Sequence, residues 1–248
     1  MDAEAGTAVR PARHGPARLE RWLGQVPLVP DRLRAWVVGV TLVATALVAG
    51  LGFYTRGSNR PVLFDRSIDS FLRQTSGPLF RIAADLSDVG DPRLFITITA
   101  AIVLLLVIWH DYRAALAAVL AVVIALVLVE DVFKPFFGRR YGDLPAPTFP
   151  SGHTTVAMAL AGVVVLATGR HRPLGRLLGP IWRPVVMVAA LALAGAVGLA
   201  MVALQLHYMT DVVTGVPLGL AVAGCTGLGV DAGAKRLTPP ADDLRGRR

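Results

Sequence analysis

The stretch AALAAVLAVVIALVLV, residues 114–129, decides the fold of this chain because every side chain in it is apolar. A helix that crosses the hydrocarbon core of a bilayer needs about 20 such residues. Comparable runs occupy residues 35–54, 94–109, 154–168, 184–206 and 212–230. The sequence therefore predicts an all-α integral-membrane bundle of about six transmembrane helices.

Composition supports a membrane protein over a nucleic-acid-binding one. Of the 248 residues 54% are hydrophobic, and the formal net charge is +8. In a membrane protein, such positive charge serves orientation and contact with anionic headgroups. We therefore expect membrane lipids as partners and no nucleic acid. Arginine far outnumbers lysine, a bias typical of GC-rich bacterial genomes, so a bacterial plasma membrane is the predicted location.

The chain divides into one membrane domain and two basic ends. We expect a disordered basic tail over residues 1–34, a six-span domain over 35–232 and a second basic tail over 233–248. Six spans place both tails on the same side, and the positive-inside rule predicts that this side is cytoplasmic. The segments around residues 134–153 and 207–211 then face the extracytoplasmic side.

Two short amphipathic helices are predicted between the first two spans. Their apolar positions recur at helical spacing before and after Gly77-Pro78, whereas Asp65 falls on the polar side. Such helices lie at the membrane interface. They could form a rim or lipid gate, or they could simply pack against the bundle.

Three polar clusters fall on the predicted outer face. The clusters are Lys134 with Arg139 and Arg140, then Ser151-Gly152-His153, and finally His207 with Asp211. Each adjoins the end of an apolar run at the same membrane level, so the three can meet in space. Together they offer the parts of a phosphoryl-transfer site.

The chemistry of each cluster fits a phosphorylated ligand. Concentrated positive charge at Lys134, Arg139 and Arg140 favours an anion such as phosphate. Ser151 and Gly152 precede a helix, whose free N–H groups form an anion cradle.

The histidines supply the reactive groups of such a site. Four-residue spacing puts His207 and Asp211 on one helical face, so the carboxylate orients an imidazole nucleophile. His153 is suited to protonating a leaving oxygen. The cations and imidazoles do not make a metal site, and no cofactor is expected.

These clusters resemble the signature of the type 2 phosphatidic acid phosphatase superfamily, K-x6-R-P, P-S-G-H and S-R-x5-H-x3-D. The resemblance covers residues 64–230 and includes the six-helix arrangement. Lys134, residues 150–153, His207 and Asp211 match the pattern. It implies that His207 attacks phosphorus, Asp211 orients it and His153 protonates the leaving group.

The sequence departs from the family pattern at two basic positions. Tyr141 and Gly142 replace the Arg-Pro pair of the first motif, and Met201 replaces the arginine of the third. Arg139 and Arg140 are close enough in sequence to substitute.

The predicted function is metal-independent hydrolysis of a lipid phosphate or polyprenyl diphosphate through a phosphohistidine. A catalytically degenerate relative that binds a phosphorylated lipid or a partner is one alternative. A small lipid transporter or flippase is another, although the spans hold few ionisable groups.

Overall fold

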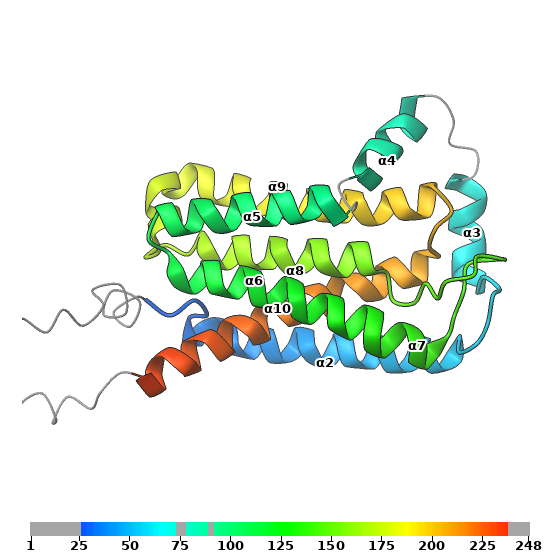
Figure 1. The fold of residues 1–248 in the computed structure, drawn as a ribbon, viewed down its shortest axis with the longest axis horizontal. Coiled ribbons are helices and arrows are strands. Elements are labelled where there is room, and N and C mark those ends of the chain that lie inside the picture. Colours follow the sequence, from blue (N-terminus) through cyan, green and yellow to red (C-terminus); the bar gives the residue numbers. More distant parts are fainter. Residues whose placement is uncertain (1–25, 73–77, 89–91, 238–248) are drawn as a thin grey trace, which may run out of the picture.

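The computed structural model describes residues 26–72, 78–88 and 92–237, and this part of the chain contains helices and no strand (Figure 1). Its helices, in chain order, are α2 (Asp31–Tyr54), α3 (Leu63–Leu72), α4 (Pro78–Asp88), α5 (Pro92–Ile108), α6 (Tyr112–Leu126), the π-helix η1 (Val127–Phe133), α7 (Lys134–Phe137), α8 (Gly152–Ala167), α9 (Pro173–Ala203) and α10 (Met209–Leu237). The all-α prediction is confirmed.

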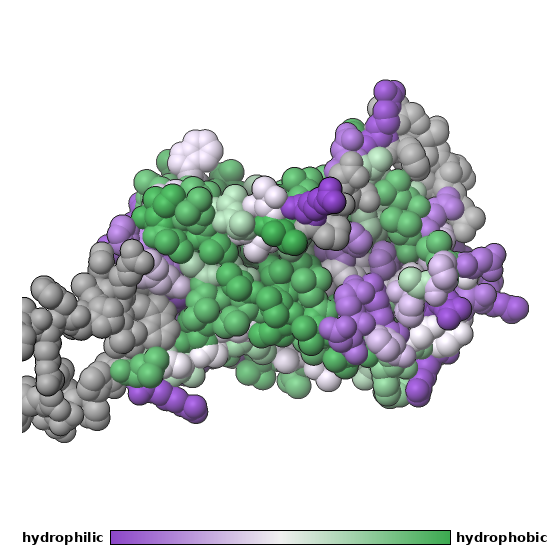
Figure 2. Space-filling view, in the orientation of Figure 1, coloured by the Kyte–Doolittle hydropathy of each residue, from purple (hydrophilic) through white to green (hydrophobic). Residues whose placement is uncertain are grey.

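Six apolar helices coincide with the six predicted runs, but they differ in length. Residues 31–54, 112–137, 173–203 and 209–237 form helices long and apolar enough to cross a membrane. The helices at 93–108 and 152–167 are apolar but shorter. Apolar residues cover the middle of the visible face, with hydrophilic residues toward its ends (Figure 2). The chain is a multi-pass membrane protein.

The core of the bundle is α8, which packs against α6, α9 and α10. Small residues allow the close approach. A Cβ on Gly219 of α10 would lie 2.3 Å from the carbonyl oxygen of Thr155, and one on Gly162 would lie 2.7 Å from Ala223. Helices in membranes associate through such small-residue contacts. The beginnings of α8 and α10 are thereby held side by side.

The described ends of the chain lie together at one end of the bundle (Figure 1). Residues 1–25 and 238–248 of the predicted tails lie outside the described residues. Within the rest of the first tail, Leu28 and Val29 are buried, and their N–H groups donate to Asp231 at 2.8 and 2.9 Å. Asp231 also accepts from Arg113 at 3.1 Å. A buried carboxylate thus ties this segment to α6 and α10.

The two predicted amphipathic helices are α3 and α4, and both pack against the bundle. α3 contacts α9 and α10, and α4 contacts α9. Ala83 of α4 is buried in one apolar cluster with Ala200 and Met201 of α9. Asp65 of α3, however, was expected on the polar face and is fully buried instead.

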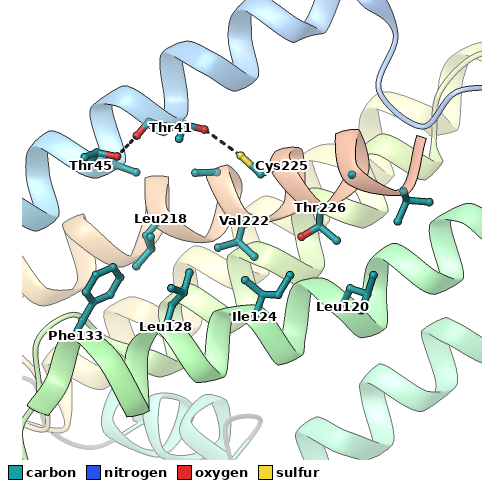
Figure 3. A pocket seen from close by; sticks show the side chains of 14 residues that line it. Thr41, Thr45, Leu120, Ile124, Leu128, Phe133, Leu218, Val222, Cys225 and Thr226 are labelled. Carbon is teal, nitrogen blue, oxygen red and sulfur yellow. Dashed lines mark hydrogen bonds between the residues drawn. The ribbon is translucent and has the colours of Figure 1, made fainter. Parts of the chain in front are cut away.

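An apolar groove of about 460 Å³ runs between α2, α6 and α10 (Figure 3). Phe133 and Leu218 line one part of it and Cys225 another, with Cys225 Sγ 3.4 Å from Thr41 Oγ1. Its lining contains no charged side chain. A phosphate therefore has no cationic partner in this groove.

Candidate active site

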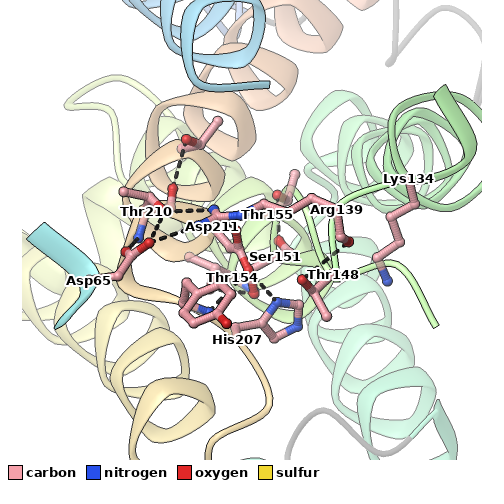
Figure 4. Close-up of polar contacts among 12 residues, drawn as sticks. Asp65, Lys134, Arg139, Thr148, Ser151, Thr154, Thr155, His207, Thr210 and Asp211 are labelled. Atoms are coloured by element: carbon pink, nitrogen blue, oxygen red, sulfur yellow. Dashed lines mark hydrogen bonds and ion pairs between the residues drawn. The ribbon is translucent and has the colours of Figure 1, made fainter. Parts of the chain in front are cut away.

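The predicted polar clusters meet at the end of the bundle where α7 ends and α8 and α10 begin (Figure 4). The ring centroids of His153 and His207 lie 6.4 Å apart, edge to face. His207 Nδ1 lies 3.5 Å from Asp211 Oδ2. Two imidazoles and a carboxylate from separate parts of the sequence are thus neighbours.

His207 lies in the turn between α9 and α10, not on a helix, which corrects the helical-face argument from its spacing. α9 ends with Gln205 in the left-handed region at φ 60°. The N–H groups of Gln205 and Leu206 donate to the carbonyls of Val202 and Met201, both at 3.0 Å. This is a Schellman motif, and it reverses the chain so that His207 lies two residues before α10.

Asp211 is held by three elements of the structure. Its Oδ2 accepts from the N–H of Tyr208 at 3.1 Å, as in the second half of a capping box. Its Oδ1 accepts from Arg139 at 2.5 Å, and its carbonyl accepts from Ser151 N–H at 3.1 Å. The contact with His207 has ion-pair distance but not hydrogen-bond geometry. Catalytic contacts are often loose without substrate.

Arg139 is fully buried, and its terminal nitrogens are bonded to protein groups. They donate to Asp65 and Thr210, each at 2.7 Å, as well as to Asp211. The guanidinium also lies 4.7 Å from the centroid of the Tyr208 ring. In Figure 4 it turns into this network, away from the amino end of Lys134. This geometry suits positioning of the site more than the predicted phosphate contact.

Asp65 is a member of this cluster that the sequence analysis missed. Its Oδ1 accepts from the N–H of Thr210 at 2.9 Å, and its Oδ2 accepts from Val62 N–H at 3.2 Å. The first bond satisfies a donor that the start of α10 leaves without an intrahelical partner. A buried carboxylate on an amphipathic helix occupies the same sequence positions as a solvent-exposed one. No sequence signal therefore distinguishes Asp65 from an exposed aspartate.

Residues 151–153 form the beginning of α8. Ser151 is the buried N-cap, and its Oγ accepts from Thr154 Oγ1 at 3.0 Å. The N–H groups of Gly152 and His153 are the first in the helix and have no intrahelical acceptor. With the helix dipole they attract an anion. The backbone arrangement required for the predicted cradle is therefore present.

Lys134 lies over this helix start, together with Glu130, which the sequence analysis also missed. Lys134 Nζ donates to both carboxylate oxygens of Glu130, at 2.6 and 2.8 Å. A Cβ on Gly152 would lie 2.7 Å from Glu130 Oε1 and 3.7 Å from Lys134 Nζ. Glu130 belongs to η1, and π-helical turns are frequent at functional sites. A carboxylate thus occupies the neighbourhood predicted for phosphate.

Arg140 points elsewhere. It is exposed and lines a polar cavity of about 530 Å³ with Asn59 and Asp143. Its backbone N–H donates to the carbonyl of Ser58 at 3.0 Å. Within the described residues no hydrogen bond or ion pair joins the Arg140 side chain to the histidine pair.

The residues at the two divergent positions serve in packing. Tyr141 is buried with its ring centroid 4.4 Å from that of Tyr208. Met201 is completely buried between α9 and α4. Neither position has room for an arginine without a change in its surroundings.

Metal ligands are not clustered in the described part of the chain. No group of three or more His, Cys, Asp or Glu side chains is arranged there to hold a metal ion.

The chain is similar to known proteins in sequence and in fold. The family model of the PAP2 superfamily matches residues 114–230. The crystal structure of a transmembrane PAP2-type phosphatidylglycerolphosphate phosphatase from Bacillus subtilis is similar, with a TM-score of 0.61 and 20% sequence identity. That alignment covers 82% of this chain and 97% of the other. No curated protein matches the sequence significantly. The matched span contains the residues of all three clusters, and this part of the chain, residues 114–230, belongs to the PAP2, or type 2 phosphatidic acid phosphatase, superfamily.

Proposed function

We propose that this protein is an integral-membrane phosphatase that hydrolyses a lipid phosphate or polyprenyl diphosphate through a phosphohistidine on His207. The observation that carries the proposal is the neighbourhood of His207, His153 and Asp211 beside the start of α8. Membership of the PAP2 superfamily and the similar fold of the Bacillus subtilis phosphatase support it.

The first chemical step transfers the phosphoryl group to His207. Its Nδ1 faces Asp211, so Nε2 attacks phosphorus while the bond from phosphorus to the lipid oxygen breaks. His153 gives its proton to that oxygen, and the lipid alcohol or phosphate leaves. The phosphoryl oxygens bind Lys134 and the N–H groups of Gly152 and His153.

The second step restores the enzyme. Water attacks phosphorus, the bond between phosphorus and nitrogen breaks, and His153 takes the proton from the water. Inorganic phosphate leaves, and no metal takes part in either step. His207 must be neutral to attack while His153 must be protonated to donate, so the rate falls at both ends of the pH range.

The site residues take two kinds of role in this proposal. Lys134, Ser151 and Gly152 bind phosphate, and Arg140 contributes only if its side chain leaves the outer cavity. Arg139 positions Asp211 from the buried side. We place the site at the extracytoplasmic face of a bacterial plasma membrane, with both tails cytoplasmic, because the two tails are basic and the positive-inside rule predicts that their side is cytoplasmic.

A degenerate relative is the second candidate, and a specific observation favours it. Both positions where the family pattern has arginine carry residues buried in packing, Tyr141 and Met201. Charge-assisted hydrogen bonds contribute about 1.5–3 kcal/mol each, so two losses weaken phosphate binding substantially. Such a protein would bind a phosphorylated lipid without turning it over.

Phosphate release from a panel of lipid phosphates and a polyprenyl diphosphate, by purified protein in EDTA, tests the proposal. We expect turnover that orthovanadate inhibits, because its trigonal-bipyramidal adduct resembles the transition state. A phosphoenzyme that is stable in base and labile in acid should form, and His207→Ala should abolish it. Binding of the same lipids without turnover would establish the degenerate relative instead.

A further inference from the structure

A second cavity, of about 760 Å³, lies at the end of the bundle opposite the candidate active site. It is lined by residues from 26–33, from the loop that follows α8 and from the middle of α9. The active site lies at Gly152, where α8 begins, and this cavity lies beyond Ala167, where α8 ends. No step of the proposed reaction uses it.

The cavity carries unbalanced positive charge. Arg32, Arg170 and Arg183 line it, and none of them forms an ion pair with the described residues. The carboxylate that also lines it, Asp31, is paired with Arg34 at 2.9 Å. Arginines gathered around one concavity without carboxylate partners favour an anionic ligand, and phosphate fits the guanidinium fork.

Three hydrogen bonds made by two arginines keep the cavity in shape. The buried Arg172 donates to Asp111 through Nε at 2.9 Å and to the carbonyl of Val26 at 2.7 Å, so it fixes the loop against the chain entering α2. Arg183 Nε donates to the carbonyl of Gly179 at 3.0 Å. Gly179 has φ 66° and interrupts α9. This last bond orients Arg183, whose terminal nitrogens form no ion pair with the described residues.

Apolar residues also line the cavity, and exposed tryptophans lie close to it in sequence. Leu33, Leu166 and Met187 form part of the wall. Two tryptophans close in sequence to the lining, Trp36 and Trp182, are 72% and 61% exposed. Exposed tryptophans are typical of the interface between hydrocarbon and water. A ligand with an anionic head and a hydrocarbon chain matches both parts of such a cavity.

We infer that this cavity binds the headgroup phosphate of an anionic glycerophospholipid from the adjacent leaflet, through Arg32, Arg170 and Arg183. Basic pockets between transmembrane helices are general sites for such headgroups. The bound lipid would join α2, the loop after α8, and α9. This inference does not depend on the proposed phosphatase activity.

Native mass spectrometry of the full chain in neutral detergent tests the inference. The probe is phosphatidylglycerol, a phosphodiester, with zwitterionic phosphatidylcholine and inorganic phosphate as comparisons. We expect a retained phosphatidylglycerol adduct and a rise in melting temperature that the comparison compounds do not produce. The combined Arg32→Gln, Arg170→Gln and Arg183→Gln variant should bind at least about tenfold more weakly, since charge-assisted bonds are lost.

Two matched variants separate this cavity from other sites. The control variant combines Arg176→Gln, Lys235→Gln and Arg236→Gln. Like the cavity variant it removes three positive charges from this end of the bundle, but these side chains lie outside the cavity, so the adduct should remain intact. Lys134→Met removes a positive charge from the candidate active site, and it too should leave the adduct intact. Should the triple cavity variant fail to fold, the single Arg32→Gln and Arg183→Gln variants replace it. Unchanged binding by the cavity variants, an equal loss in the charge-matched control, or equal binding of phosphatidylcholine would overturn the inference.

Discussion

His207 Nδ1 lies 3.5 Å from Asp211 Oδ2 although His207 precedes the helix that carries Asp211. The side chain of Asp211 also caps α10, because it accepts a hydrogen bond from the N–H of Tyr208. It accepts a second hydrogen bond from the guanidinium of Arg139. One carboxylate thus connects the nucleophile proposed here to the buried ion-pair network. Its position does not depend on His207.

His207→Ala should therefore abolish phosphate release while leaving the fold intact, because no hydrogen bond ends on His207 Nδ1. Asp211→Asn should lower kcat by about 10²–10⁴-fold, as orienting aspartates do in catalytic triads. Phosphate release and the melting temperature of each variant are the measurements. Residual activity in His207→Ala above background would contradict the nucleophile assignment.

Arg139→Ala should destabilise the protein, because it leaves Asp65 and Asp211 buried without their cation. Breaking a buried pair by removing one partner costs about 3–5 kcal/mol. The free energy of unfolding, from SDS titration in mixed micelles, measures this cost. Arg140→Ala is the control, and its exposed side chain predicts a change within about 0.5 kcal/mol. An Arg139→Ala variant with the wild-type free energy of unfolding but weaker vanadate binding would contradict this prediction. Arg139 would then bind phosphate, as the sequence predicted.

Glu130→Gln should strengthen inhibition by orthovanadate, because the carboxylate of Glu130 competes with the anion for Lys134. The Glu130 side chain is 47% exposed, so solvent screens the effect to about 0.5–1 kcal/mol, or roughly two- to fivefold in the inhibition constant. Asp131→Asn removes a neighbouring exposed carboxylate and serves as the control. Equal inhibition constants in the two variants would show that Glu130 does not occupy the anion position.

Met201→Arg should destabilise the protein and not activate it, although it restores the residue of the family pattern. The Met201 side chain is fully buried beside Ala83 and Ala200, where a guanidinium has no carboxylate partner in that apolar cluster. Met201→Leu, which conserves volume, should cost less than about 1.5 kcal/mol. A stable Met201→Arg variant with a higher kcat would contradict this prediction. It would mean that α4 moves to admit the arginine and that wild type lacks a phosphate contact which this arginine supplies.

The transmembrane orientation can be tested with single cysteines in a Cys225→Ser background. Asp143→Cys, at an exposed position near the candidate active site, should react with an impermeant thiol reagent added to intact cells. Arg176→Cys, exposed at the opposite end of the bundle, should react only after lysis. The reverse labelling pattern would invert the orientation proposed here.

The sequence by itself determined the all-α membrane fold, since an uninterrupted apolar run such as residues 114–129 can satisfy its backbone in lipid only as a helix. It also indicated which clusters meet, because each adjoins a helix end at a common depth. The spacing of His207 and Asp211 was informative even though the helical geometry assumed for it was wrong. A capped turn brings the same two side chains together.

Only the tertiary structure decided which charges have partners. Asp65 and Arg139 have the sequence features of a solvated helix face and of a phosphate clamp, yet both are buried and bonded to each other at 2.7 Å. Glu130 likewise became part of the site only when the π-helix placed it over Gly152. The physical reason is that burial and ion pairing arise from contacts between elements far apart in the chain, whereas periodicity and capping are local properties that each segment carries in its own residues.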